Sequence, residues 1–153
     1  MNIFVLDKDP VKSAQLQKDR HVIKMCLESC QLLCNCFDQD KVPYKRTHYN
    51  HPCSKWARES KENFNWLKQH AIALCEEYTF RYGKVHKCRQ VIDTLPEFKC
   101  NNKQMTKFAL AMPEQYKEED EVKSYINYYT NEKLINSKWK NREIPEIFRQ
   151  VID

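Results

Sequence analysis

The segment DRHVIKMCLESCQLL, residues 19–33, has the residue pattern of an amphipathic helix. At about 3.6 residues per turn, its apolar residues and one serine share one side of the helix. They are Val22, Met25, Cys26, Ser29 and Leu33. The polar residues fall along a second stripe, formed by His21, Lys24, Glu28, Gln31 and Asn35. The pattern predicts a helix that packs against a core while its polar stripe carries an imidazole, an ammonium and a carboxylate.

The polar stripe has two interpretations. In the first it is a solvated helix face, on which Lys24 and Glu28 form an ion pair. Lysine before glutamate stabilises a helix less than the reverse order. In the second it is a site on a rigid helix, with Glu28 as a general base or electrostatic stabiliser. His21 and Lys24 then contact the phosphates or bases of a nucleic acid.

Length and composition narrow the class of protein. A chain of 153 residues can bury one sizeable core, so we expect a single domain over residues 1–153. Its only glycine, Gly83, excludes phosphate-binding loops and dinucleotide fingerprints, which need several glycines. The net charge of +5 permits nucleic acid binding without requiring it. Residues 1–7 are apolar over too short a distance for a signal peptide, so we expect a soluble cytoplasmic protein that is not secreted.

The predicted fold is all-α, a compact domain built on two long helices over about residues 10–37 and 52–82. Asp9-Pro10 supplies an N-cap and a first residue for one helix, and Gly83 supplies a left-handed C-cap for the other. We expect a kink near Asp19 in the first of these helices.

The other segments are predicted to be shorter. Residues 1–8 form an extended arm or a short strand, and residues 38–50 form a loop. A break near Ser60 is expected in the second long helix. Shorter C-terminal helices are expected over residues 85–92, 107–112 and 118–139, with a last helical turn that begins at Pro145.

The eight cysteines have two interpretations. Four of them fall within the first long helix, where reduced cysteine packs as a small apolar residue. The alternative is a zinc site that combines Cys30, Cys34 and Cys36 with His21 or His51. Since the chain has no paired C-x2-C motif, we expect core packing, with no metal and no cofactor.

Two further segments carry residues suited to nucleic acids. His48, Asn50 and His51 precede the helix that opens at Pro52, where free backbone N–H groups favour phosphate. The alternative there is simple capping of the helix by Asn50 or His51. Further candidates for DNA binding are the basic residues near that helix and at the end of the second long helix, which are Lys45, Arg46, Arg58 and Arg81. For Arg81, a favourable interaction with the helix C-terminus is an equally simple explanation.

With these residues laid out, the chain resembles the phage-type pyrimidine-dimer DNA glycosylases of the endonuclease V superfamily. The resemblance rests on Asp19-Arg20-His21, on Glu28 two turns later, and on Asn50-His51-Pro52 before a helix that closes at Arg81-Tyr82-Gly83. It covers roughly residues 10–90. The chain is still more similar to uncharacterised small phage proteins that share residues 50–53 and 58–60.

The resemblance implies a repair glycosylase that acts on pyrimidine dimers in double-stranded DNA and can cleave the strand as an abasic-site lyase. It implies Glu28 as the essential carboxylate, His21 as a substrate contact and an N-terminal α-amine as the group that attacks the sugar C1′. The family exposes a small residue after removal of the initiator, whereas Asn2 disfavours removal, so we expect the amine of Met1 in this role. Arg20, Lys24, Lys45 and Arg46 are expected to hold phosphates, and the protein to act as a monomer away from membranes, in the host cytoplasm if it is viral.

Two other functions stay open at this point. One is an enzyme that modifies pyrimidines, or removes modified ones, in phage DNA, which needs Glu28 and the histidines but no lyase amine. The other is a helical protein that binds a nucleic acid or a protein without catalysis, in which the polar stripe is only a solvated face.

Overall fold

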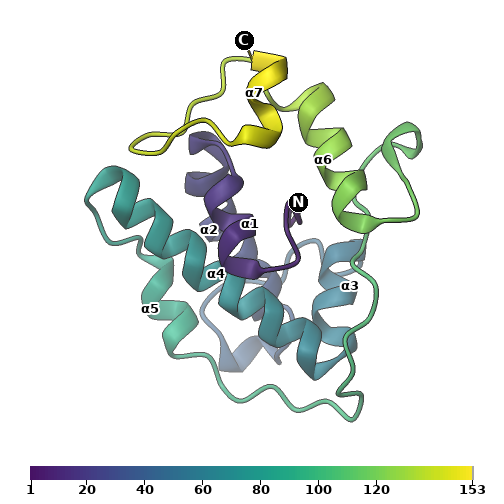
Figure 1. Ribbon diagram of the computed structural model, residues 1–153. Helices are drawn as coiled ribbons and strands as arrows, with labels where there is room; N and C mark the ends of the chain where they lie inside the picture. The colour runs from purple at the N-terminus through teal and green to yellow at the C-terminus, as the bar shows by residue number, and fades with distance from the viewer. Residues whose placement is uncertain (153) are drawn as a thin grey trace.

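The computed structural model describes residues 1–152, and all of the regular elements in that range are helical (Figure 1). The α-helices are α1 (Pro10–Leu16), α2 (Asp19–Cys34), α3 (Pro52–Glu59), α4 (Lys61–Tyr82), α5 (Cys88–Asp93), α6 (Glu121–Glu132) and α7 (Glu146–Ile152). Two 3-10 turns, Gln39–Lys41 and Glu114–Tyr116, lie in the connections. The all-α prediction is confirmed. Among residues 1–152 no helix is both long enough and apolar enough to cross a membrane.

Each of the two predicted long helices is divided in two. The first breaks after Leu16, because Gln17 is extended (φ −73°, ψ 142°), and α2 then ends at Cys34, short of the predicted residue 37. The second breaks at Ser60, which is also extended (φ −151°, ψ 161°) and whose hydroxyl accepts a hydrogen bond from the Asn63 N–H as the N-cap of α4. Both breaks fall within two residues of the positions that the sequence indicates.

The predicted caps are present. The Asp9 carboxylate accepts hydrogen bonds from the N–H groups of Val11 and Lys12 at the start of α1. Gly83 ends α4 in the left-handed region (φ 69°), and its N–H donates to the Thr79 carbonyl. Residue types at helix ends therefore locate these boundaries better than the periodicity does.

The C-terminal third departs further from the prediction. The helix expected over residues 107–112 was wrong, because this segment has no regular secondary structure. Its polar backbone groups are bound by side chains instead: Tyr125 donates its hydroxyl to the Ala109 carbonyl and accepts from the Ala111 N–H. Its Phe108 ring stacks on Trp56 with the ring centres 5.0 Å apart. The predicted helix over 118–139 is shorter, since α6 spans Glu121–Glu132, and that over 85–92 begins three residues later, as α5.

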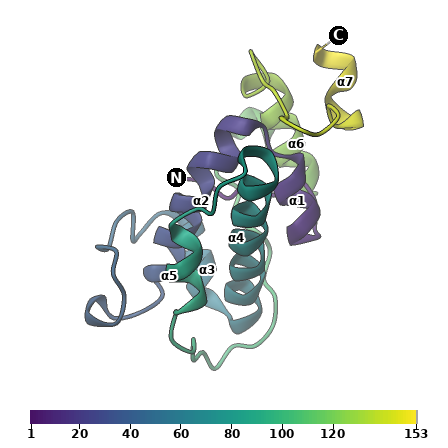
Figure 2. The ribbon, with the colours of Figure 1, turned by 90° about the vertical axis from the view of Figure 1, so that its left-hand side faces the viewer.

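Helix α4 lies at the centre of the fold and contacts α1, α2, α3 and α5. The views in Figures 1 and 2 place α6 and α7 together at one end of the molecule, beside α1 and the start of α2. The N-terminal arm runs between these parts. Its residues Ile3, Phe4, Val5 and Leu6 are all buried in the core.

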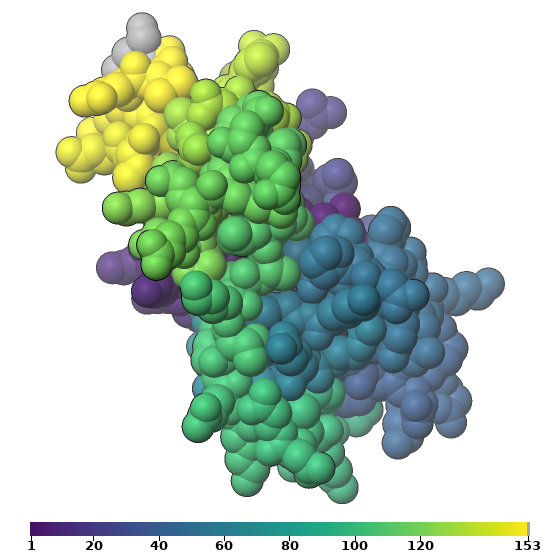
Figure 3. Space-filling model, turned by 90° about the vertical axis from the view of Figure 1, so that its right-hand side faces the viewer, coloured from purple at the N-terminus to yellow at the C-terminus, as the bar shows by residue number. Residues whose placement is uncertain are grey.

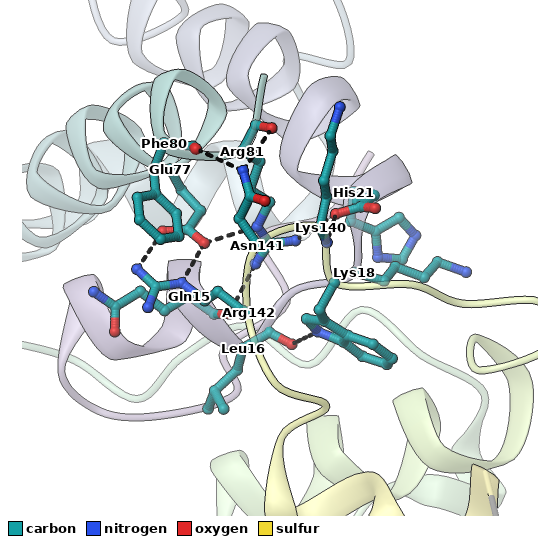
Figure 4. A network of polar contacts seen from close by, with 12 residues as sticks. Gln15, Leu16, Lys18, His21, Glu77, Phe80, Arg81, Lys140, Asn141 and Arg142 are labelled. Atoms are coloured by element: carbon teal, nitrogen blue, oxygen red, sulfur yellow. Dashed lines mark hydrogen bonds and ion pairs between the residues drawn. The ribbon is translucent and has the colours of Figure 1, made fainter. Parts of the chain in front are cut away.

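A polar network centred on Arg81 attaches the C-terminal segment to the helices (Figure 4). The Arg81 guanidinium is fully buried and donates to Glu77 Oε2 at 2.7 Å, to Asp19 Oδ1 at 3.0 Å and to the Gln15 carbonyl at 2.9 Å. Arg142, from the C-terminal segment, donates to both oxygens of the same Glu77 carboxylate. The buried Glu77 carboxylate thus binds two guanidinium groups. Together these contacts join α1, α2, α4 and the C-terminal segment.

We predict that Arg81→Met destabilises the fold by about 3–5 kcal/mol, because it leaves the buried Glu77 carboxylate with only one of its two partners and removes the contact to Asp19. Urea unfolding measures the loss. The matched control is Arg89→Met, since Arg89 pairs with Asp93 at the surface, where such a pair contributes less than about 1 kcal/mol. Equal losses in the two variants would contradict this account of the network.

Candidate active site

The N-terminal amine lies beside the Glu28 carboxylate. The Met1 nitrogen is 3.5 Å from Glu28 Oε1. The ammonium of Lys24, one turn earlier in α2, is 3.5 Å from Glu28 Oε2. Glu28 itself is only 8% exposed, and its Oε2 atom is buried without a hydrogen-bond partner. A carboxylate with a free acceptor position is available to a substrate group or to a developing positive charge.

Asn2 directs the amine toward Glu28. Its side-chain Oδ1 accepts hydrogen bonds from the N–H groups of Ile3 (2.7 Å) and Phe4 (3.0 Å), which makes a tight turn at the start of the arm. Its Nδ2 donates to the carbonyl of Ala111 at 2.8 Å. Asn2 is therefore a positioning residue that the sequence analysis considered only as a context for methionine removal.

His21 is part of the support for the arm. Its ring stacks on Phe4 with centres 4.3 Å apart, and its Nδ1 lies 2.8 Å from the Tyr129 hydroxyl. Burial, followed by the charge of Lys18, lowers the pKa of His21 to about 3, so its ring is neutral at physiological pH. Only 8% of the residue is exposed. The structure thus places His21 behind the arm, in contact with Phe4, and its remaining exposed surface lines a hollow beside Lys24.

The start of α3 forms another wall of the site. His51 caps this helix by accepting the Cys53 N–H at its Nδ1 (3.0 Å), which decides between the two predicted caps, and Asn50 is left exposed. Burial and the charge of the N-terminal amine lower the pKa of His51, while Glu28 opposes that shift. The Cys53 thiol faces the same two charges, and burial raises its pKa to about 12. His51 is therefore a mainly neutral base close to the amine and the carboxylate.

The loop before α3 presents basic side chains. The Tyr49 ring is contacted by two guanidinium groups, that of Arg46 at 4.2 Å from the ring centre and that of Arg58 at 3.7 Å. Arg58 also donates to the Tyr49 carbonyl and to Ser54, so it is used to hold the loop. Lys45, Arg46 and His48 are exposed.

A basic hollow of about 500 Å³ adjoins the site on the other side of Lys24. Its lining includes the cations Lys18, Arg20, Lys24 and Lys133, with Glu132 as the one acidic residue. The pKa of Lys18 is lowered by burial and by the neighbouring charge of Lys133. Arg20 and Lys24 are exposed at its edge, which leaves them free to contact an anion.

The surface view shows where the site opens. In Figure 3, purple atoms from the start of the chain reach the surface between the blue segment, which includes the loop before α3, and the green segment that leads into α6. Arg81 does not reach this surface, because its side chain is fully buried and paired with Glu77 and Asp19, out of reach of a phosphate.

The low pKa of His21 makes the stability of the fold dependent on pH. The unfolded chain, in which the histidine pKa is near 6.5, takes up a proton that the folded chain excludes, so stability falls as the pH drops from about 6.5 toward about 3. Between about pH 7.5 and about pH 5 we expect His21 to account for a loss of about 2 kcal/mol, measured by urea unfolding. His21→Gln should remove that share of the loss, whereas His48→Gln, at an exposed position, should keep it. The same acid loss in wild type and His21→Gln would refute the assignment.

Comparison with known proteins identifies the family of the chain. Residues 1–90 match the family model described as pyrimidine dimer DNA glycosylase. No curated protein and no solved structure matches the chain. The matched region contains the N-terminal arm, α1 to α4 and the start of α5, and with them Met1, Glu28 and His51. Because the match covers more than half of the 153 residues, the chain belongs to the pyrimidine dimer DNA glycosylase family, whose members are DNA repair enzymes.

Proposed function

We propose that this protein removes damaged pyrimidines, pyrimidine dimers in particular, from double-stranded DNA and then cleaves the strand as an abasic-site lyase. The observation that carries the proposal is the 3.5 Å approach of the N-terminal amine to the buried Glu28 carboxylate. An amine and a carboxylate in contact with each other are the two groups that covalent base removal requires.

The amine of Met1 is the proposed nucleophile. α-Amino groups are less basic than lysine side chains, so a useful fraction is neutral at physiological pH. The nitrogen attacks C1′ of the damaged nucleotide, the bond from C1′ to the base breaks, and the base leaves with the bonding electrons and takes up a proton that the nitrogen loses. The sugar ring then opens at the bond from C1′ to O4′, and O4′ takes up a proton, which leaves a protonated imine between C1′ and the nitrogen. This imine makes the C2′ proton acidic, and its removal expels the 3′ phosphate.

Glu28 has two proposed tasks in this sequence. Its free Oε2 stabilises positive charge as it develops on the sugar, and its Oε1 orients the amine. His51, whose Nδ1 accepts the Cys53 N–H, caps α3 near the amine and helps to shape the site. Lys24 pairs with the same carboxylate from the solvent side.

The basic surface around the opening is the proposed DNA contact. Arg20, Lys24, Lys45 and Arg46 are exposed and lie on both sides of the amine site, so they can hold phosphates flanking the damaged nucleotide. Exposed His48 and Asn50 extend this surface. Arg58 supports the loop from behind, and Arg81 has a structural role only.

Borohydride trapping tests the chemistry, because reduction converts an imine into a stable covalent adduct. On ultraviolet-irradiated duplex we expect an adduct that maps by peptide mass to the N-terminal residue. Glu28→Gln should lower its rate of formation by a factor of about 10²–10⁴ while DNA binding is retained. The control, Glu97→Gln, changes an exposed carboxylate and should leave the rate unchanged.

Three results of this experiment would count against the proposal. An adduct at an internal lysine would move the nucleophile away from Met1. Trapping on duplex that carries modified pyrimidines, with none on irradiated or abasic duplex, would replace damage repair by removal of modified bases. Unchanged trapping in Glu28→Gln would remove Glu28 from the mechanism.

The phosphate contacts predict a salt dependence. Each of the changes Arg20→Gln and Lys45→Gln should reduce the slope of log affinity against log salt concentration by about one, because each removes one released counterion. Fluorescence anisotropy on intact duplex measures the slope. Lys103→Gln, at an exposed position in the connection between α5 and α6, should leave it unchanged. A slope that moves equally in all three variants would show that binding follows net charge alone.

A further inference from the structure

Five of the eight cysteines meet between three helices, on the side of α2 away from the amine. All five are buried; they are Cys26, Cys30 and Cys34 from α2, Cys75 from α4 and Cys88 at the start of α5. The Cys26 thiol contacts that of Cys75, and the Cys30 thiol contacts those of Cys34 and Cys88. Helix α5 contacts both α2 and α4, as Figure 2 shows.

His86 completes this cluster. The ligand atoms of Cys26, Cys75 and His86 all lie within 4.8 Å of one another. The imidazole packs edge-on against Tyr78, with ring centres 4.9 Å apart, and its side chain contacts the Cys88 thiol. Since His86 is half-buried while the cysteines are buried, it gives an ion a route from solvent to the thiols.

We propose that Cys26, Cys75, His86 and Cys88 bind one Zn²⁺ ion. Ligands about 2.3 Å from a tetrahedral zinc ion lie about 3.8 Å apart, so donors already within 4.8 Å need shifts of only about 1 Å. Cys88 is the proposed fourth ligand, because its thiol contacts His86 and lies near Cys26; it is outside the group of donors within 4.8 Å and needs a larger shift to reach the ion. Binding releases the protons of the three thiols to solvent, and three thiolates with one histidine form a known type of structural zinc site.

The surrounding groups suit such an ion. The Tyr44 hydroxyl lies 3.5 Å from Cys88 Sγ, and the Cys30 thiol contacts the same sulfur, so both can donate hydrogen bonds to a zinc-bound thiolate. Cys26 and Cys30 face away from Glu28, because two residues along a helix are rotated by about 200°. The ion therefore has a structural task, separate from the proposed chemistry at Glu28.

That task is to attach α5. This helix has six residues, and its N-cap, Lys87, makes no capping hydrogen bond through its side chain. The residues before it, Gly83 to Val85, are exposed. Coordination by residues 86 and 88 would connect this weakly held segment to α2 and α4 through bonds stronger than apolar contacts.

Metal analysis of the full chain, purified without a metal-binding tag, tests the site. Native mass spectrometry should show one zinc ion per chain. Exchange with Co²⁺ should give a thiolate charge-transfer band and the intense visible bands of a tetrahedral site. His86→Gln changes a half-exposed residue and should keep the fold, yet weaken zinc binding at least about 10-fold in competition with a chelator. Cys100→Ser, outside the cluster, should bind zinc as wild type does.

Thermal unfolding gives a second measurement, for which none of the five clustered cysteines has to be changed. A chelator should lower the Tm of wild type and Cys100→Ser, and should lower that of His86→Gln by much less. The proposal is overturned by a folded wild-type chain without zinc that gives no thiolate band with Co²⁺. It is also overturned by a disulfide between any two of the five clustered cysteines in the native protein.

Discussion

The burial of residues 2–6 without regular secondary structure, with Phe4 in the left-handed region (φ 48°), is the constraint on which the site depends. A buried segment outside helices and sheets has no regular partners for its N–H and C=O groups, and unpaired groups in a core are costly. Here side chains serve as partners. Asn2 accepts from Ile3 and Phe4, Ser13 accepts from Leu6 and donates to the Phe4 carbonyl, and Gln17 reaches the Ile3 carbonyl. The arm is held at several of its polar groups, so the amine at its end has a defined position.

The position of the amine brings charges of both signs together around the buried Glu28 carboxylate. The amine and Lys24 both approach Glu28, which gives two cations against one buried carboxylate. A further cation at His21 would be repelled, and the lowered pKa of that residue keeps it neutral. The nearby basic hollow leaves room for the negative charge of a DNA backbone to complete the balance.

The sequence predicts well the features that depend on local patterns. Helix α2 has the predicted apolar side, with Val22, Met25, Cys26, Ser29 and Leu33 all buried, and the caps at Asp9 and Gly83 fix two helix boundaries. It predicts poorly what depends on distant partners. The segment 107–112 has an apolar helical period, but Tyr125 binds its backbone in another conformation, which no local pattern reveals. Arg81 is a basic residue at a helix end, which is typical of a DNA contact. Its partners are instead Glu77, four residues earlier, and Asp19, 62 residues away.

Residues beyond the family match complete the site. The carbonyl of Ala111 holds Asn2, and the Tyr129 hydroxyl holds both His21 and the N–H of Lys18. Phe148, from α7, stacks on Tyr129 with ring centres 5.4 Å apart, and the Arg142 contact to Glu77 binds the same segment to α4. The first 90 residues supply the reacting groups, while α6 and the C-terminal segment fix the arm that carries one of them. A change in this C-terminal part therefore acts on the distance between amine and carboxylate as well as on stability, because the same side chains determine both.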